Sequence, residues 1–284
     1  MSRIAYVNGE FVPLERASVS ILDRGFVFAD GIYEVTAVID GRMIDNRLHL
    51  ERLQRSVGEI SLALPETRER IEEIQVELMR RNQLSEGIIY LQVTRGVAER
   101  DFAFPPDARP TLVMFTQAKN LVNPPAAAAG FKVVTCPDLR WARRDIKSVG
   151  LLAQVLAKQA AAAAGCQEAW MLDAGMVTEG SSSTAYIITQ DGVIVTRPRS
   201  TATLPGCTRI ALQRLVAQRQ LELEERAFSL VEALSCREAF VTSASSLVTA
   251  VVEIDGKPVG DGRPGPLVSE LRRLYIEAAR ANPA

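Results

Sequence analysis

Tight turn signals between short apolar runs constrain the fold of this 284-residue chain more than any other feature. Asn8-Gly9 separates the apolar runs Ile4–Val7 and Phe11–Pro13, and Asn-Gly supplies the positive φ angles that a two-residue β-hairpin turn requires. The pattern recurs around Asp40-Gly41, between Ile32–Val38 and Met43-Ile44, and around Asp191-Gly192, between Ala185–Ile188 and Val193–Thr196. The sequence therefore predicts hairpins, which a plain repeat of parallel strand–helix–strand units would not contain.

The rest of the chain mixes helical and strand patterns. Apolar residues at helical spacing predict helices, and unbroken apolar runs predict buried strands. The expected helices are 48–62, 70–84, 151–164, 208–220 and 267–281, and the further expected strands are 88–94, 111–115, 131–135, 168–172, 239–242 and 248–254. This order favours an α+β fold with long mixed sheets.

One segment has the composition of a linker. Asn120 to Ala129 reads NLVNPPAAAA, with two prolines, small residues and no hydrophobic periodicity. We therefore expect two domains: a small N-terminal α/β domain over 1–119, a linker over 120–129 and a larger C-terminal domain over 130–284.

Composition and spacing exclude several classes of function. The net charge is −1 and the basic residues are scattered, which argues against a nucleic-acid partner. The start of the chain lacks a signal-peptide pattern, and its most apolar stretch, 151–165, is too short to cross a bilayer. Four cysteines without a CxxC pair predict free thiols and no metal. We expect a soluble, cytoplasmic protein.

The chain contains a single histidine, His49, which we expect to be a packing or capping residue rather than a catalytic base. It also contains only five lysines: Lys119, Lys132, Lys147, Lys158 and Lys257. Lys147 lies between an aromatic-basic segment and an apolar run, where partial burial would lower the pKa of its amine and make it nucleophilic, although a lysine before a helix is more often a surface residue. Glu179 fits either a turn cap or the acidic partner of a pyridine nitrogen. A helix start at LPGCTR offers N–H groups to a phosphate.

Six segments together resemble one family. FADGIYEV, HLERL, RWARRDIKSVGLL, VTEGSSSTAYII, LPGCTR and FVTSASSLVTAVVEIDG occur in this order. In combination they resemble the class IV, or fold-type IV, pyridoxal-phosphate aminotransferases over residues from about 5 to about 270. The resemblance implies a two-domain α+β enzyme, with pyridoxal 5'-phosphate at the domain interface, that is usually a homodimer.

The resemblance also implies roles for particular residues. Lys147 corresponds to the Schiff-base lysine that carries the proton, Glu179 to the partner of the pyridine nitrogen, and Arg52 to a phosphate ligand. Further phosphate contacts are implied at Cys207, Thr208, Ser243 and Ala244. Ala244 departs from a threonine common in the family, so one hydroxyl contact is expected to be missing.

The branch most similar to this chain is the D-amino-acid transaminases. Tyr33 and Arg100 match the residues that bind the substrate carboxylate there, whereas Phe102 replaces the family's histidine. Three outcomes stay open: weaker carboxylate binding, a shifted side-chain preference, or acceptance of R-amines. Arg100 could instead be a solvated loop residue paired with Glu99 or Asp101.

The expected reaction is a ping-pong transamination through a Schiff base on Lys147. It would move the amino group of a D-amino acid, such as D-alanine or D-glutamate, to a 2-oxo acid. The alternatives of the same fold are an R-selective amine transaminase, a branched-chain L-amino-acid transaminase and an aminodeoxychorismate lyase. A non-catalytic α+β binding protein is a further alternative, which would keep the phosphate loop without a use for Lys147.

Overall fold

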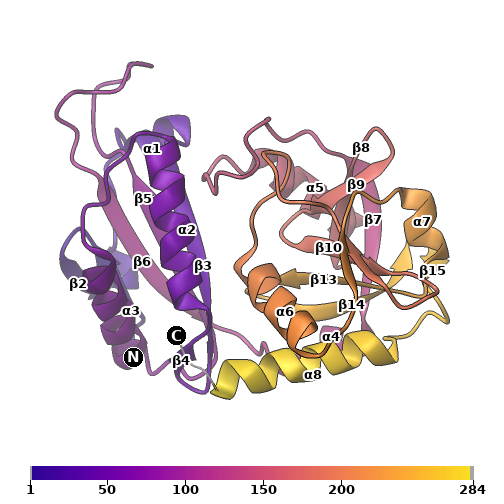
Figure 1. Ribbon diagram of the computed structural model, residues 1–284. Helices are drawn as coiled ribbons and strands as arrows, with labels where there is room; N and C mark the ends of the chain where they lie inside the picture. Colours follow the sequence, from indigo (N-terminus) through magenta and orange to yellow (C-terminus); the bar gives the residue numbers. More distant parts are fainter. Residues whose placement is uncertain (1, 282–284) are drawn as a thin grey trace. The chain divides into compact units, whose positions relative to one another are not determined.

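The computed structural model describes residues 2–281 and divides the chain into two compact units (Figure 1). Among the described residues, unit 1 comprises 2–120 and 146–150, and unit 2 comprises 121–145 and 151–281. The segment that carries Lys147 is therefore grouped with unit 1, although the chain on either side of it belongs to unit 2. The domain boundaries at 119 and 130 stay predictions. The proposed linker is not wholly irregular, because Pro125–Ala129 form the short helix α4.

Unit 1 contains a six-stranded sheet. Its strand order is β2 (Glu10–Pro13), β1 (Ile4–Val7), β6 (Thr111–Ala118), β5 (Gly87–Thr94), β3 (Gly31–Ile39) and β4 (Arg42–Met43). Each neighbouring pair is antiparallel, so the expectation of mixed sheets is wrong for this unit. The physical reason is local: Asn8 and Gly9 both have positive φ, as do Asp40 and Gly41, so tight hairpins join β1 to β2 and β3 to β4.

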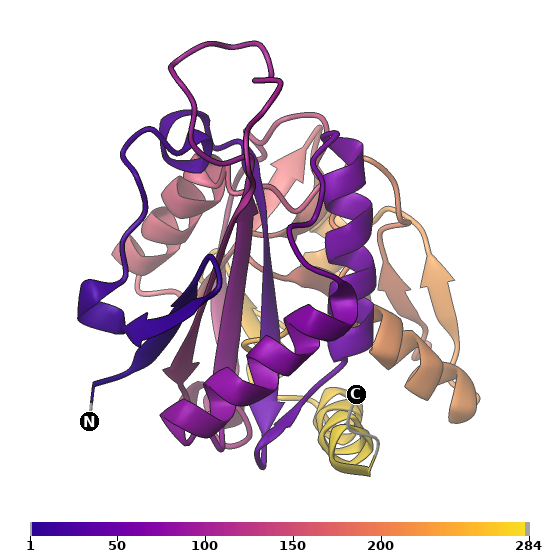
Figure 2. The same cartoon turned by 90° about the vertical axis from the view of Figure 1, so that its left-hand side faces the viewer.

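Two helices pack against this sheet: α2 (Asn46–Glu59) and α3 (Arg68–Asn82) (Figure 2). Leu53 and Val57 of α2, with Ile71 and Ile74 of α3, are fully buried in one cluster with the strand residues. Two short elements precede β3: a 3-10 turn (Leu14–Arg16) and α1 (Arg24–Phe28). A long loop between β5 and β6 projects from the end of the sheet (Figure 2).

Unit 2 contains a nine-stranded mixed sheet. Its main path is β12 (Leu223–Glu225), β11 (Ile194–Thr196), β10 (Thr184–Ile188), β13 (Glu238–Ser243), β14 (Leu247–Ile254), β7 (Phe131–Pro137), β8 (Glu168–Asp173) and β9 (Met176–Gly180), and β15 (Lys257–Pro258) pairs with β14. β7 is parallel to both of its neighbours, β14 and β8, and α5 (Leu152–Ala163) forms part of the crossover that a parallel β7–β8 pair requires. The expected mixed sheet is confirmed here.

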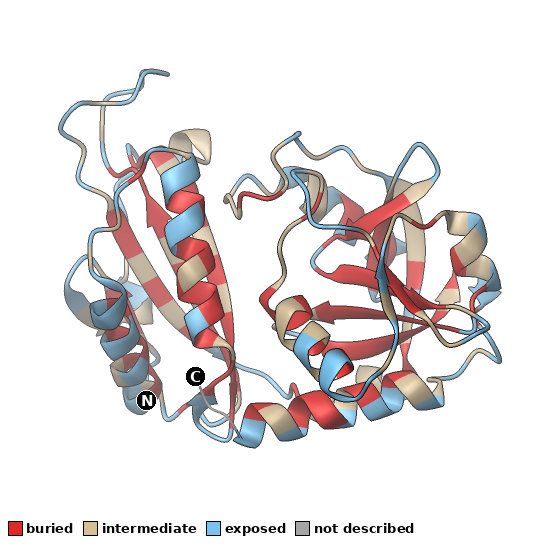
Figure 3. Ribbon diagram, viewed as in Figure 1, coloured by how far each residue is buried: buried red, intermediate tan, exposed pale blue. Residues whose placement is uncertain are grey.

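Three more helices belong to unit 2: α6 (Cys207–Gln218), α7 (Leu230–Ser235) and α8 (Pro266–Ala281). One side of α8 is buried and the other exposed (Figure 3), as its alternating apolar and charged residues require. The sequence patterns did not predict the short elements α1, α4, α7, β9, β12 and β15, because runs this short carry little periodicity. No helix within residues 2–281 has the length and apolar composition of a membrane span.

Candidate active site

Lys147 is held in unit 1 by strand-like pairing with β3. The N–H of Tyr33 donates to the Lys147 carbonyl at 3.0 Å, and the N–H of Val149 donates to the Gly31 carbonyl at 3.0 Å. The Lys147 Nζ lies 4.1 Å from the centre of the Tyr33 ring. Among residues 2–281, no carboxylate pairs with this half-buried ammonium group. The backbone therefore positions an amine that no ion pair occupies.

Tyr33 is part of an aromatic stack across three strands. Its ring is stacked on Tyr90 with the centroids 5.7 Å apart, and Tyr90 is stacked on Phe115 at 4.8 Å. The Tyr90 hydroxyl donates to Gln92 Oε1 at 2.7 Å, and burial raises the pKa of Tyr90 to about 12. These contacts hold the Tyr33 ring as a fixed surface under the Lys147 side chain.

Glu34, the residue after Tyr33 on β3, is buried in a polar network with α2. Its carboxylate accepts hydrogen bonds from Arg52 Nε and Nη2, both at 2.7 Å, and its Oε2 lies 2.8 Å from His49 Nδ1. Burial opposes ionisation of Glu34, but the charge and hydrogen bonds of Arg52 outweigh it and lower its pKa to about 2. His49, which we expected to pack or cap, is a hydrogen-bonded member of a buried network. Two nitrogens of Arg52 donate to Glu34. The phosphate role of Arg52 stays a prediction.

Glu179 lies on β9 of unit 2, not in a turn. Its buried carboxylate accepts a hydrogen bond from Arg140 and another from the N–H of Leu204, at 3.2 Å to Oε1. Burial raises the pKa of Glu179, and the Arg140 guanidinium acts against this effect. Arg140 also binds Asp138 in a bidentate pair at 2.9 and 2.7 Å. Sequence reasoning missed Arg140, although its spacing of two residues from Asp138 at a strand end is a signal for such a pair.

The hydroxyls of the three serines that follow Gly180 bind a carboxylate of the protein itself. The hydroxyls of Ser181, Ser182 and Ser183 all donate to the carboxylate of Glu168, the first residue of β8. Lys158 Nζ lies 3.5 Å from the same carboxylate, so its side chain is not simply solvated. These hydrogen bonds fix the turn from β9 to β10, which begins two residues after Glu179.

The predicted phosphate contacts of unit 2 occur at the start of α6 and the end of β13. α6 begins at Cys207, and both Cys207 and Thr208 are buried. A Cβ added to Gly206 would lie 3.1 Å from Thr184 Oγ1, and Thr184 pairs with Thr242, the residue before Ser243. The structure therefore brings the start of α6 close to the end of β13.

Ser243 is the last residue of β13, and Ala244 begins the turn that follows it. The Ser243 hydroxyl accepts from the N–H of Ser246 at 3.1 Å and lies 2.7 Å from the Ser246 hydroxyl. The backbone groups here and the N–H groups at the start of α6 suit an anion, because the positive end of a helix dipole adds to their donors. Ala244 contributes no hydroxyl, as the sequence predicts.

Arg100 and Phe102 lie in the loop between β5 and β6, and both are exposed. The Arg100 guanidinium lies 5.2 Å from the Phe28 ring centre and 5.4 Å from that of Phe102. The two rings lie 5.3 Å apart. Arg100 is exposed, as the solvated-loop alternative expects, but within the described part of the chain it forms no ion pair with Glu99 or Asp101.

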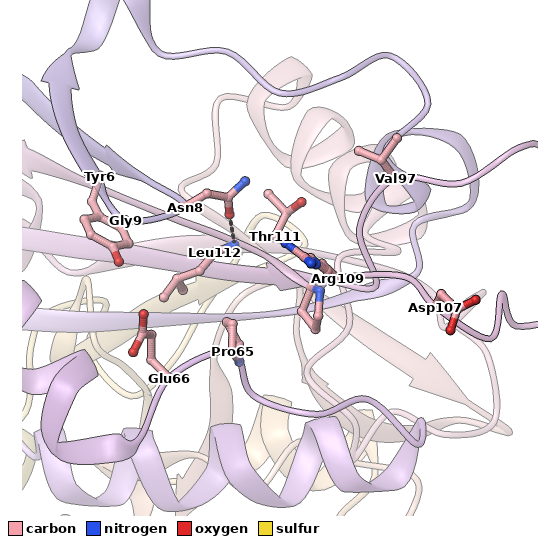
Figure 4. Close-up of a pocket in the computed structure, with 11 residues that line it drawn as sticks. Tyr6, Asn8, Gly9, Pro65, Glu66, Val97, Asp107, Arg109, Thr111 and Leu112 are labelled. Carbon is pink, nitrogen blue, oxygen red and sulfur yellow. Dashed lines mark hydrogen bonds between the residues drawn. The ribbon is translucent and has the colours of Figure 1, made fainter.

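Unit 1 also contains a cavity of about 710 Å³ (Figure 4). Its lining includes Tyr6, Glu66, Asp107 and Arg109, and none of the predicted site residues lines it. The cavity therefore includes none of the candidate groups, which are the amine of Lys147 in unit 1 and, in unit 2, the buried carboxylate of Glu179 and the N–H groups at the start of α6. An aldehyde-bearing, phosphorylated pyridine needs these three kinds of group.

Known proteins of one family are similar to this chain. The family described as "Amino-transferase class IV" matches residues 31–254. A protein of Staphylococcus aureus (strain MSSA476) named D-alanine aminotransferase is 41% identical over 96% of this chain and 98% of its own length. A D-alanine aminotransferase of Bacillus licheniformis is 36% identical over 93% of each chain.

Solved structures give the same fold. A branched-chain amino acid aminotransferase of T.th., complexed with N-(5'-phosphopyridoxyl)-L-glutamate, has a TM-score of 0.91 to this chain. It is 26% identical, and the match covers 99% of this chain and 95% of the other. The predicted α+β, fold-type IV architecture is confirmed by this likeness.

Proposed function

Because this chain belongs to the class IV aminotransferase family, we propose that it moves the amino group of a D-amino acid to a 2-oxo acid. The observation that carries the proposal is Lys147, an amine fixed by β3 over the Tyr33 ring without a carboxylate partner among residues 2–281. The choice of a D-amino acid is supported by the relatives at 36–41% identity, which are named D-alanine aminotransferase.

Pyridoxal 5'-phosphate is the cofactor that the donor set fits. Glu179 offers a buried carboxylate to the pyridine nitrogen, and Lys147 offers the amine. Arg52, Cys207, Thr208, Ser243 and Ala244 are the proposed phosphate contacts. When bound, the cofactor supplies an electron sink that weakens the bonds to the substrate Cα. Support also comes from the structure of the T.th. enzyme, whose bound compound is a phosphopyridoxyl derivative.

In this reaction, different residues of the chain would transfer the proton, support the cofactor and bind the substrate. Lys147 Nζ would hold and move the proton at the substrate Cα, since this half-buried amine lies over the Tyr33 ring without an ion-pair partner among the described residues. Arg140 would oppose the rise in the pKa of Glu179 that burial causes. Arg100 and Tyr33 would bind the substrate carboxylate, and Phe102 would make this wall more apolar than a histidine would. The donor would leave as a 2-oxo acid before the acceptor binds.

A spectroscopic and kinetic experiment tests the proposal. We expect the purified protein to bind pyridoxal phosphate with a visible absorbance band that changes on addition of D-alanine. Lys147→Ala should abolish both the band change and the transfer, whereas Lys119→Ala, at an exposed lysine, should leave both intact. A protein that never takes up the cofactor would contradict the proposal.

A substrate panel separates the branches of the family. The donors are D-alanine, D-glutamate, L-leucine and (R)-1-phenylethylamine, each with pyruvate and with 2-oxoglutarate. We expect the D-amino acids to be preferred. A strong preference for L-leucine would overturn the branch and leave the cofactor assignment standing. Release of pyruvate without a second keto acid would indicate a lyase.

We also propose a homodimer. The exposed face of α5 carries Leu152, Val155 and Leu156, of which 72%, 58% and 58% are accessible. These residues share one face because they lie three and four positions apart. A contiguous apolar face of this kind supports association with a second copy of the chain, as is usual for the resembled family. A cytoplasmic location stays a prediction.

A further inference from the structure

Arg24 is a buried arginine that the proposed chemistry does not use. It is the first residue of α1, and 3% of its surface is accessible. Its Nε donates to Asp30 Oδ2 at 2.9 Å. A buried guanidinium requires a partner for its charge and acceptors for its remaining N–H groups, so the other contacts of Arg24 are informative.

The remaining N–H groups of Arg24 bind three successive backbone carbonyls. Nη1 donates to the carbonyls of Asp101 and Ala103, at 2.5 and 3.3 Å, and Nη2 donates to that of Phe102 at 3.4 Å. These residues follow Arg100 directly. The Arg24 guanidinium thus fixes the backbone of an otherwise exposed loop directly after Arg100.

An aromatic pair continues the same arrangement. The Arg24 guanidinium lies 4.8 Å from the Phe28 ring centre, and the Arg100 guanidinium lies over the same ring. Phe28 in turn contacts Phe102. Cation–π attraction therefore restricts Arg100 from one side, while the clamped backbone restricts it from the other.

Asp30 has a second arginine partner, so Arg24 can be replaced without leaving the Asp30 carboxylate unpaired. Arg95 also binds Asp30, with Nε at 2.7 Å from Oδ2 and Nη2 at 3.1 Å from Oδ1. Loss of Arg24 would therefore leave the Asp30 carboxylate paired, and no buried charge would be left without a partner.

We propose that Arg24 is a positioning residue for the substrate carboxylate: it fixes the 101–103 backbone and, through Phe28 and Phe102, the guanidinium of Arg100. The inference rests on the proposed function, in which Arg100 binds that carboxylate. It also gives Phe102 a role: its ring orients Arg100 where a histidine would have donated a hydrogen bond.

The test compares Arg24→Gln with Arg80→Gln, a control at an exposed arginine of α3. Substrate binding is followed as the KM for D-alanine. Reaction of hydroxylamine with the bound cofactor is measured beside it, because this nucleophile carries no carboxylate. We expect Arg24→Gln to raise the KM for D-alanine about tenfold with a smaller change in kcat. The hydroxylamine rate should stay within about twofold, and Arg80→Gln should match the wild type.

A double-mutant comparison makes the test specific. If Arg24 acts through Arg100, Arg24→Gln should change the KM by less than about twofold in an Arg100→Gln background. Equal effects in both backgrounds, or a parallel fall in the hydroxylamine rate, would overturn the inference. Should Arg24→Gln not fold, Phe28→Leu removes the shared ring and is expected to show the same pattern.

Different results would contradict the proposed function and the proposed role of Arg24. A wild-type protein that reacts with hydroxylamine but never with D-alanine would contradict the proposed substrate. An active wild type whose KM for D-alanine is unchanged by Arg24→Gln would contradict the role of Arg24 alone.

Discussion

Two buried carboxylates of this chain have opposite pKa shifts, although both are paired with arginine. Glu34 has a pKa of about 2, whereas the pKa of Glu179 is raised. Burial acts on both in the same direction. Glu34 receives Arg52 in bidentate contact together with His49, while Arg140 divides its donors between Glu179 and Asp138. Glu34 therefore receives more hydrogen-bond donors than Glu179, and the negative charge of Asp138 raises the pKa of Glu179 further.

Replacement of Arg140 by Met should make the role of Glu179 visible. Without the guanidinium, the pKa of the buried Glu179 carboxylate rises further. If the ionised form is the partner of the pyridine nitrogen, the acid limb of the kcat/KM profile should move to higher pH by about one unit or more. Arg140→Lys keeps the charge and should restore part of the shift. An unmoved profile in Arg140→Met would contradict the role of Glu179.

At the scale of elements, α5 is unusual because its exposed side is apolar. Its buried side rests on the small residues Ala157 and Ala161, which allow close packing on the sheet. Leu152, Val155 and Leu156 lie on the other side. A helix that is apolar on both sides is stabilised when a second surface covers the side that the sheet leaves exposed. The sequence pattern of α5 did not show which of its two sides would pack on the sheet.

Val155→Glu is expected to weaken self-association. Burial of a new carboxylate in a dimer interface would carry a large desolvation cost, so the monomer fraction should increase. Sedimentation or size-exclusion chromatography over a range of protein concentrations would measure it. Val76→Glu on α3 is the matched control, because Val76 is also an exposed valine but belongs to a different helix. Equal behaviour of both variants would contradict an interface at α5.

Across the whole molecule, buried carboxylates paired with arginine occur in both units. Burial opposes ionisation of Asp30 in unit 1 and of Asp138 in unit 2, but hydrogen bonds from arginine lower the pKa of each below its ordinary value. Glu34 adds a large shift of its own, to about 2 from 4.5. Folding should therefore depend on pH in the acidic range.

The free energy of unfolding is expected to fall as the pH decreases from about 4.5 toward 2. Glu34 stabilises the fold fully above its unfolded pKa, and this stabilisation is lost as the carboxylate is protonated, a contribution on the order of 3 kcal/mol. Urea unfolding followed by circular dichroism at several pH values would measure it. Glu34→Gln should reduce stability at pH 7 and flatten the acid dependence, whereas Glu51→Gln, at a glutamate whose side chain is 41% accessible, should not.

The sequence by itself determined the long elements and the family. Hairpin turns at Asn8-Gly9 and Asp40-Gly41 depend on local backbone preferences, and α2, α3 and α8 depend on a periodicity that spans several turns. The motif order predicted a class IV aminotransferase, and the family comparison confirmed it. The roles of Lys147 and Glu179 stay predictions that their positions support.

Tertiary structure alone decided which side chains meet. The Arg140–Glu179 pair, the serine cage around Glu168 and the clamp of Arg24 on the 101–103 carbonyls join residues 13 to 79 positions apart in the chain. The sequence shows that charged residues are present at these positions, but it does not show which charges share a buried volume. Burial then strengthens each pairing and shifts the pKa values, because a low-dielectric interior magnifies any charge that lies close by.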